Sequence, residues 1–140
     1  MSRPTGKANR IEATAYRREH FVDMVTRYFK AVDDRDVEET LEYFNDDAVL
    51  IVQTDHKRFE GKEAIRQMFS QFFENSSAIY HEVLNWVVEP TENKCATEQT
   101  YRGTLKNGTV NEMHNCNFFD FENGKFKRVI IFMSGTNPLQ

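Results

Sequence analysis

Three stretches of this sequence hold the side chains best suited to proton transfer near neutral pH. An acidic stretch, Asp33-Asp34-Arg35-Asp36, comes early, and His81 and His114 follow much later in the chain. A neutral imidazole is a usable base near pH 7, and a carboxylate beside it fixes its tautomer and stabilises the imidazolium that forms. General-base catalysis of this kind accelerates reactions by about 10²–10⁴-fold. The residue types therefore suit proton transfer.

Motifs for other chemistry do not occur in the sequence. The two cysteines, Cys95 and Cys116, form no CxxC pair and no Cys/His cluster with zinc spacing. A phosphate loop, a dinucleotide fingerprint and a nucleophile elbow are all missing. We therefore expect a site without a metal or a cofactor.

Composition narrows the class of partner. The chain has 140 residues and a net charge of −4, with a pI near 5.6, which argues against binding nucleic acid or an anionic membrane. Its 12 Phe, 5 Tyr and 1 Trp can build a large core and line an apolar pocket for a hydrophobic small molecule. Because no apolar secretory segment opens the chain and no apolar run approaches about 20 residues, we expect a cytoplasmic protein that does not cross a membrane.

Three helices are predicted in the first half of the chain. Residues 1–14 are polar and are expected to be a flexible tail that precedes a single domain over 15–140. Apolar residues at helical spacing predict one helix over Arg18–Val32 and another over Lys62–Phe73. Asp36 resembles an N-cap, with Glu39 three residues later, and opens a short helix that extends to Phe44.

In the second half of the chain, apolar and polar residues alternate with a period of two, which is typical of strands. After a first strand over Ala48–Gln53, preceded by an Asn45-Asp46-Asp47 turn and followed by a polar loop at His56 and Lys57, four long strands are expected. They cover Ala78–Glu89, Lys94–Leu105, Val110–Glu122 and Lys125–Ser134. Asn-Gly pairs at two of the turns favour hairpins. The order predicts an α+β fold, with a cone-shaped, curved mixed or antiparallel sheet and three helices on its concave face.

Four segments carry a family resemblance: TRYFKAVDDRDVEETLEYFNDDAVLIV, FEGKEAIRQMFSQFF, IYHEVLNWVVEP and FENGKFKRVIIF. In these, over roughly residues 19–133, the chain resembles the nuclear transport factor 2-like superfamily, especially its SnoaL-like polyketide cyclase branch. The resemblance implies a deep apolar cavity and a homodimer formed through the outer sheet face. The superfamily includes isomerases, dehydratases, cyclases, epoxide hydrolases and binding modules, so the fold alone does not define a reaction.

The resemblance implies a catalytic dyad of Asp33 and His81. AVDDRD and YHEV match places where scytalone dehydratase and hexachlorocyclohexane dehydrochlorinase hold a helix-end Asp against a strand His, and Asp34 is the alternative carboxylate. Tyr28 matches the oxyanion-hole tyrosine of ketosteroid isomerase. The general-base Asp of that isomerase is replaced by Val52, which disfavours the same mechanism.

The predicted strand Val110–Glu122 offers two alternative candidates for a side chain in the cavity. Aligned on ketosteroid isomerase, His114 occupies a catalytic position in the cavity, whereas alignment on scytalone dehydratase favours Asn115 as a substrate-binding group. The two residues point to opposite faces of a strand, so only one of them enters the cavity. Asn85 shares the parity of His81 and is a further substrate-binding candidate, and the expected apolar linings are Phe29, Phe69, Phe73, Val83, Trp86, Val87, Tyr101 and Phe132.

The expected function is that of a cofactor-free enzyme that acts on a hydrophobic small molecule by general acid/base proton transfer, as a dehydratase, isomerase or cyclase. The alternative is a non-catalytic small-molecule-binding or dimeric accessory module of the same fold. A third interpretation is the small subunit of an aromatic-ring dioxygenase, although such subunits are usually longer.

Overall fold

The computed structural model describes residues 16–139, so the tail predicted over residues 1–14 lies outside the described residues. The helices are α2 (Arg18–Asp33), α3 (Val37–Leu41) and α4 (Lys62–Glu74). The strands are β1 (Phe44–Val52), β2 (Lys57–Glu60), β3 (Ser76–Glu89), β4 (Lys94–Leu105), β5 (Val110–Glu122) and β6 (Lys125–Phe132). Two short 3-10 turns, η1 (Gln53–Asp55) and η2 (Pro90–Glu92), precede β2 and β4.

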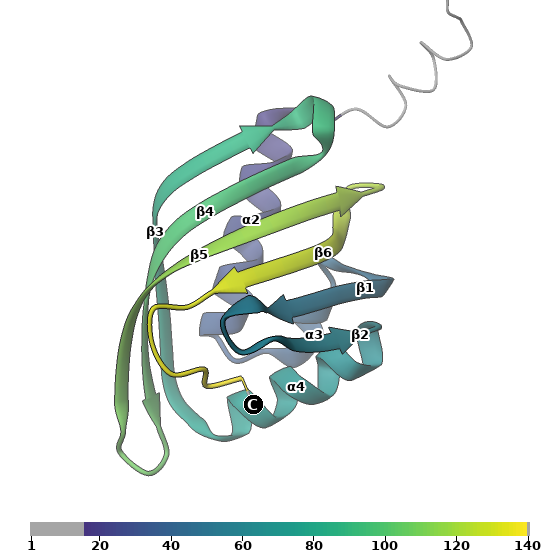
Figure 1. The fold of residues 1–140 in the computed structure, drawn as a ribbon. Coiled ribbons are helices and arrows are strands. Elements are labelled where there is room, and N and C mark those ends of the chain that lie inside the picture. Colours follow the sequence, from purple (N-terminus) through teal and green to yellow (C-terminus); the bar gives the residue numbers. More distant parts are fainter. Residues whose placement is uncertain (1–15, 140) are drawn as a thin grey trace, which may run out of the picture.

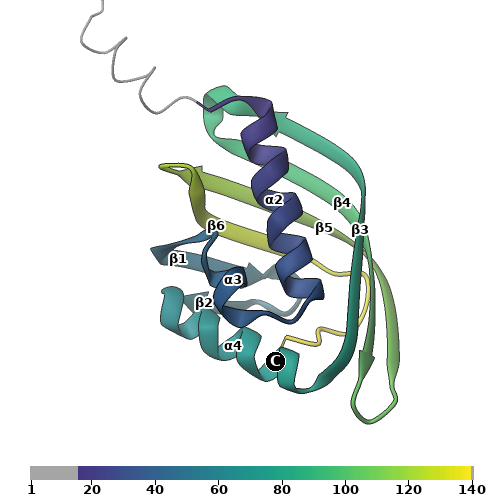
Figure 2. The same ribbon diagram turned by 180° about the vertical axis from the view of Figure 1, so that it is seen from behind.

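The six strands form one curved sheet in the order β2-β1-β6-β5-β4-β3. Neighbours are antiparallel except β1 and β6, which are parallel. The sheet bends strongly along β3, β4 and β5, and no helix covers the face turned to the viewer in Figure 1. Figure 2 shows α2 lying across the opposite face, with α3 and α4 below it. The expected α+β fold with helices on the concave side of a curved mixed sheet is confirmed.

Local sequence explains where the first helices end. The apolar stripe of α2 buries Phe21, Val25 and Val32, and the helix ends at Asp33. Arg35 then adopts a positive φ of 56°, which reverses the chain. The Asp36 carboxylate accepts a hydrogen bond from the Glu39 backbone N–H at 3.0 Å, as expected of an N-cap. Asp33 is thereby fixed at the rim of the sheet.

Three sequence predictions in the segment between α3 and α4 are wrong. Phe44 does not end a helix, and the Asn45-Asp46-Asp47 stretch is not a turn, because β1 already begins at Phe44 opposite Phe126 and contains an irregularity before Val49. The predicted loop at Lys57 is instead the edge strand β2, paired with β1. Polar residues are tolerated there because an edge strand leaves one side to solvent.

Aromatic side chains fill most of the space between helices and sheet. Nine of the twelve phenylalanines are buried, so the interior is mainly packed core and only limited free space remains beside it.

Within residues 16–139, every helix is too short or too polar to cross a membrane.

Candidate active site

Asp33 and His81, which lie 48 residues apart in sequence, form a two-point contact. Asp33 Oδ1 lies 2.6 Å from His81 Nδ1, and Asp33 Oδ2 accepts a hydrogen bond from the His81 backbone N–H at 3.0 Å. Because an ionised carboxylate only accepts hydrogen bonds, Nδ1 carries the proton and donates it. In the neutral ring Nε2 then bears a free lone pair, which is the arrangement that a general base needs.

Two aromatic residues pack beside the His81 ring. Phe29 of α2 stacks on it with ring centroids 4.7 Å apart, and Tyr101 of β4 lies at 5.4 Å. The side chains of His81 and Asp33 are 11% and 21% exposed. The imidazole is therefore shielded from bulk water without being sealed off.

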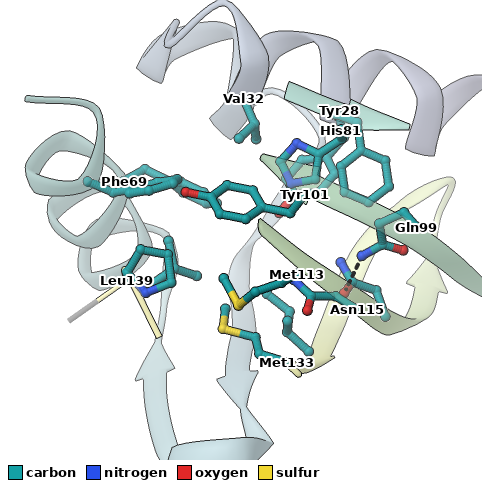
Figure 3. A pocket seen from close by; sticks show the side chains of 15 residues that line it. Tyr28, Val32, Phe69, His81, Gln99, Tyr101, Met113, Asn115, Met133 and Leu139 are labelled. Atoms are coloured by element: carbon teal, nitrogen blue, oxygen red, sulfur yellow. Dashed lines mark hydrogen bonds between the residues drawn. The ribbon is translucent and has the colours of Figure 1, made fainter. Parts of the chain in front are cut away.

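His81 separates a cavity from a groove. The cavity lies inside the cone and has a free volume of about 40 Å³ (Figure 3). It is lined by Tyr28, Phe29, Val32, Phe69, Phe72, His81, Gln99, Tyr101, Met113, Asn115, Asn117, Ile131, Met133, Pro138 and Leu139. The groove runs outside, between α2 and β3, has a volume of about 330 Å³ and is lined by Thr26, Phe29, Lys30, Asp33, Asp34, His81, Val83 and Trp86.

The free nitrogen of His81 lies on the cavity side of the ring. Asp33 lines the groove but not the cavity, so the ring edge opposite the Asp33 contact turns inward. Among the described residues, no side chain or backbone group hydrogen-bonds to Nε2. A proton acceptor is thus presented to the cavity.

Of the predicted lining residues, Tyr28, Phe29, Phe69 and Tyr101 reach the cavity. Burial raises the pKa of Tyr101 to about 12 and also raises that of Tyr28, so both phenols stay protonated at neutral pH. They can act as hydrogen-bond donors but not as bases.

A row of buried amides on the cavity wall was not anticipated from the sequence. Thr97 Oγ1 donates to Gln99 Oε1 at 2.7 Å, and Gln99 Nε2 donates to Asn117 Oδ1 at 3.0 Å (dashed line in Figure 3). Gln99 and Asn117 are 1% and 2% exposed. Their alternation with Tyr101 and Asn115 was the signal that could have identified them. These amides give the otherwise apolar cavity one polar wall.

His114 does not enter the cavity, which corrects its assignment as a catalytic candidate. Asn115, Asn117 and Phe119 take the inward positions of β5, so the alternation turns His114 to the outer face. There His114 Nε2 pairs with Glu98 at 2.5 Å, more than half of its side chain being exposed. Asn115 is the residue of this pair that lines the cavity, and its Oδ1 accepts a hydrogen bond from the Ser134 backbone N–H at 3.1 Å.

Asn85 also faces away from the cavity, because β3 contains a bulge. Val83 pairs with Gln99 and Asn85 with Glu98, so Leu84 is an extra residue that reverses the alternation. Asn85 consequently hydrogen-bonds to Glu98 on the outer face. Trp86 turns to the inner side and lines the groove rather than the cavity.

The remaining predicted linings belong elsewhere. Phe73 packs against Phe69 and Phe72 in the core and does not line the cavity. Val87 and Phe132 are exposed on the outer sheet face, and Asp34 pairs with Lys30 instead of His81.

Within residues 16–139, no three His, Cys, Asp or Glu side chains gather in a way that could hold a metal ion.

An open curved sheet that encloses an aromatic cavity against three helices defines the nuclear transport factor 2-like, or cystatin-like, class of protein. The chain belongs to the SnoaL-like domain family, whose profile matches residues 25–129. No curated protein matches the sequence significantly.

Solved structures with this fold carry diverse descriptions. A candidate aromatic ring hydroxylase from Novosphingobium aromaticivorans is 25% identical, with a TM-score of 0.77 over 85% of this chain and 90% of that one. A candidate SnoaL-like polyketide cyclase from Shewanella denitrificans is 13% identical, with a TM-score of 0.74 over 84% and 92%. An LEH-like epoxide hydrolase from M. tuberculosis is 12% identical, with a TM-score of 0.73 over 83% and 84%. At the two lower identities, the similarity concerns the fold.

Proposed function

We propose that this protein is a cofactor-free enzyme that moves a proton on a hydrophobic small molecule, in a dehydration, isomerisation or cyclisation. His81 is the general base, and Asp33 fixes its tautomer and stabilises the imidazolium. The observation that carries the proposal is the 2.6 Å contact between Asp33 and His81 beside an apolar cavity.

The lining of the cavity supports this chemistry over two others in the superfamily. Epoxide hydrolysis calls for an arginine flanked by carboxylates, whereas the described lining residues include no arginine, aspartate or glutamate. Ketosteroid isomerase chemistry places a base where this chain has the fully buried Val52. The apolar rings and the amides favour a cyclic molecule that carries hydrogen-bonding oxygens.

The size of the cavity sets a condition on binding. About 40 Å³ holds roughly three water molecules and no ring-sized ligand. The walls nearest the C-terminus are Met113, Met133, Pro138 and Leu139, and thioether chains adapt readily to a ligand. We therefore propose that substrate enters by displacing the segment at Pro138 and Leu139.

The test is a proton-exchange assay that needs no known substrate. Cyclohexanone, 2-cyclohexenone and 2-tetralone are incubated with the protein in D₂O, and loss of their α-proton signals is followed by NMR. Wild-type protein should accelerate exchange over buffer, and His81→Ala should lose about 10²–10⁴-fold of that acceleration. His114→Ala is the matched control and should exchange like wild type. An unchanged rate in His81→Ala would rule out His81 as the base.

The alternative is a non-catalytic binding module of the same fold, in which His81 plays no chemical part. In that case ketones would bind with equal affinity to wild type and to His81→Ala, and neither protein would accelerate exchange. Measuring affinity by calorimetry beside the exchange rate separates the two functions.

We further propose that the protein forms a homodimer through the outer sheet face. Val87, Phe118 and Phe132 are 68%, 46% and 43% exposed there, and the Phe118 and Phe132 rings lie 6.0 Å apart edge to face. Together with Ala96 and Ile130, they make an apolar patch on the face that the helices leave uncovered. A second copy of the same face offers a patch of matching shape and polarity.

A further inference from the structure

The Tyr101 hydroxyl is buried without a partner. Tyr101 is 3% exposed, and within the described part of the chain its oxygen contacts no hydrogen-bonding group. Buried polar groups are normally paired, since an unpaired hydroxyl gives up its bonds to water without replacement. This hydroxyl belongs to a side chain that lines the cavity, with its ring 5.4 Å from that of His81. Because the oxygen itself is almost inaccessible, it gains a partner only from a ligand that enlarges the cavity beside it.

Gly103 sets the position of that hydroxyl. The Tyr101 ring leans along β4 over Gly103, and in Figure 3 its hydroxyl end reaches across the cavity toward α4. A methyl group on the Cα of Gly103 would lie 1.9 Å from Tyr101 Oη and 2.5 Å from Cζ. Such a contact is impossible, so any other residue at position 103 would move the ring.

We propose that Tyr101 is a catalytic hydrogen-bond donor to a carbonyl oxygen of the substrate, and that Gly103 is the positioning residue that aims it. This inference rests on the proposed function and deepens it by naming the class of substrate, an apolar cyclic ketone with an α-hydrogen. It also separates the donor from the base, since the two come from adjacent strands, β4 and β3.

The proposed step transfers one proton and shifts two electron pairs of the ketone, all within the cavity. The α C–H bond breaks, its proton passes to His81 Nε2, and its electron pair forms the C=C bond while the carbonyl π pair moves onto oxygen. Tyr101 keeps its proton and stabilises the oxygen by donating a hydrogen bond to it. Its raised pKa, about 12 because of burial, keeps the donor protonated throughout the neutral range. The imidazolium later returns its proton to carbon or oxygen.

The experiment uses 2-tetralone labelled with ¹³C at the carbonyl. Infrared spectroscopy of the bound ketone reports hydrogen bonding, because a donor lowers the C=O stretching frequency, and α-proton exchange reports chemistry. In Tyr101→Phe the frequency should rise toward its value in an apolar solvent, and the exchange rate should fall on the order of 10²-fold. Tyr80→Phe, which alters a tyrosine 57% exposed on the other face of the sheet, should change neither.

Gly103→Ala tests the positioning role. It should raise the C=O frequency as Tyr101→Phe does while 2-tetralone still binds, and Gly103→Ala combined with Tyr101→Phe should lose no more exchange than Tyr101→Phe alone. A lowered frequency retained in Gly103→Ala would overturn the role of Gly103. A frequency that rises in Tyr28→Phe rather than Tyr101→Phe would assign the donor to Tyr28 and overturn the proposal, and failure of any ketone to bind would overturn the substrate class.

The two proposals fail in different ways. If His81 is not the base, exchange persists in His81→Ala while the frequency still depends on Tyr101. If Tyr101 is not the donor, exchange still depends on His81 while the frequency is the same in Tyr101→Phe and wild type.

Discussion

At the scale of single residues, both oxygens of Asp33 serve one partner. One binds the ring of His81 and the other its backbone N–H, so the carboxylate fixes the side chain and the strand that carries it. An amide in its place offers one acceptor oxygen instead of two. The dyad should therefore respond to loss of charge even when the shape of the side chain is preserved.

We expect Asp33→Asn to shift the tautomer of His81. Wild-type His81 should be protonated at Nδ1, and the variant should show a mixture in which Nε2 also carries the proton, because the amide no longer holds both donors. Long-range ¹H–¹⁵N NMR of the imidazole distinguishes the two forms. Asp34→Asn, next in sequence but paired with Lys30 in solvent, is the control and should retain the wild-type tautomer. Protonation at Nε2 in wild type would contradict the prediction.

At the scale of elements, one carboxylate ties three strands together on the outer face. Asp120 of β5 lies 3.0 Å from Lys94 Nζ of β4 and accepts a hydrogen bond from Arg128 Nε of β6 at 2.8 Å. Burial alone would raise the pKa of Asp120, but the hydrogen bonds from Lys94 and Arg128 outweigh it and lower that pKa. The carboxylate therefore contributes stability where it is ionised.

Asp120→Asn should destabilise the protein by about 1 kcal/mol at pH 7, the size expected for charge-assisted bonds to half-exposed cations. Because the folded pKa lies below the unfolded value of about 3.9, the contribution is full above that value and disappears as pH falls through the folded pKa. Urea unfolding of both proteins between pH 2 and 7 measures this difference. Asp55→Asn, at an exposed position that forms no ion pair with the described residues, is the control and should show no such pH dependence.

The sequence predicts an element well where the pattern of neighbouring residues alone determines it. The periodicity of α2, α4 and the long strands is a property of neighbouring residues, and the bounds of β4 and β5 match their prediction. The edge strand β2 carries no apolar alternation of its own and exists because β1 offers it a partner. Tertiary pairing, rather than propensity, therefore decides that segment.

The residues of the candidate site also differ in whether local sequence or strand pairing determines their positions. The pairing of Asp33 and His81 was implied by the family resemblance, and the helix end and the strand that carry them are both predicted from local sequence. Alternation along the sequence assigns Asn85 to the wrong face, because Leu84 adds one residue to β3 and a single bulge reverses every later side chain. The choice between His114 and Asn115 likewise depended on a register that only strand pairing fixes.

At the scale of the whole molecule, the C-terminal segment closes the cavity. Leu139 is 6% exposed and lies against the cavity with Pro138. We expect Leu139→Ala to enlarge the free space, to cost about 2 kcal/mol of stability, and to strengthen binding of 2-tetralone. Calorimetry and urea unfolding measure these effects. Leu84→Ala, at a position 46% exposed, should change stability by less than about 0.5 kcal/mol and leave binding unchanged. Weaker binding in Leu139→Ala would mean that Leu139 holds the ligand rather than excluding it.

The outer sheet face leads to a prediction about assembly. A lysine at position 118 would place a charge in the centre of the apolar patch and, in a dimer, oppose the same charge on the partner. Phe118→Lys should therefore be monomeric in sedimentation-velocity experiments in which wild type is dimeric. Lys57→Glu on β2, away from the patch, should leave the dimer intact. A wild-type monomer at all concentrations would contradict the proposed dimer.

The bulge at Leu84 has one practical consequence. By turning Trp86 to the inner side of β3, it places the only indole of the chain in the groove with Asp33 and His81. The intrinsic fluorescence of the protein therefore arises beside the dyad and needs no attached dye to report on it. Quenching by a charged imidazole, or a shift in emission when a guest displaces water, would appear directly in the spectrum of the unmodified protein.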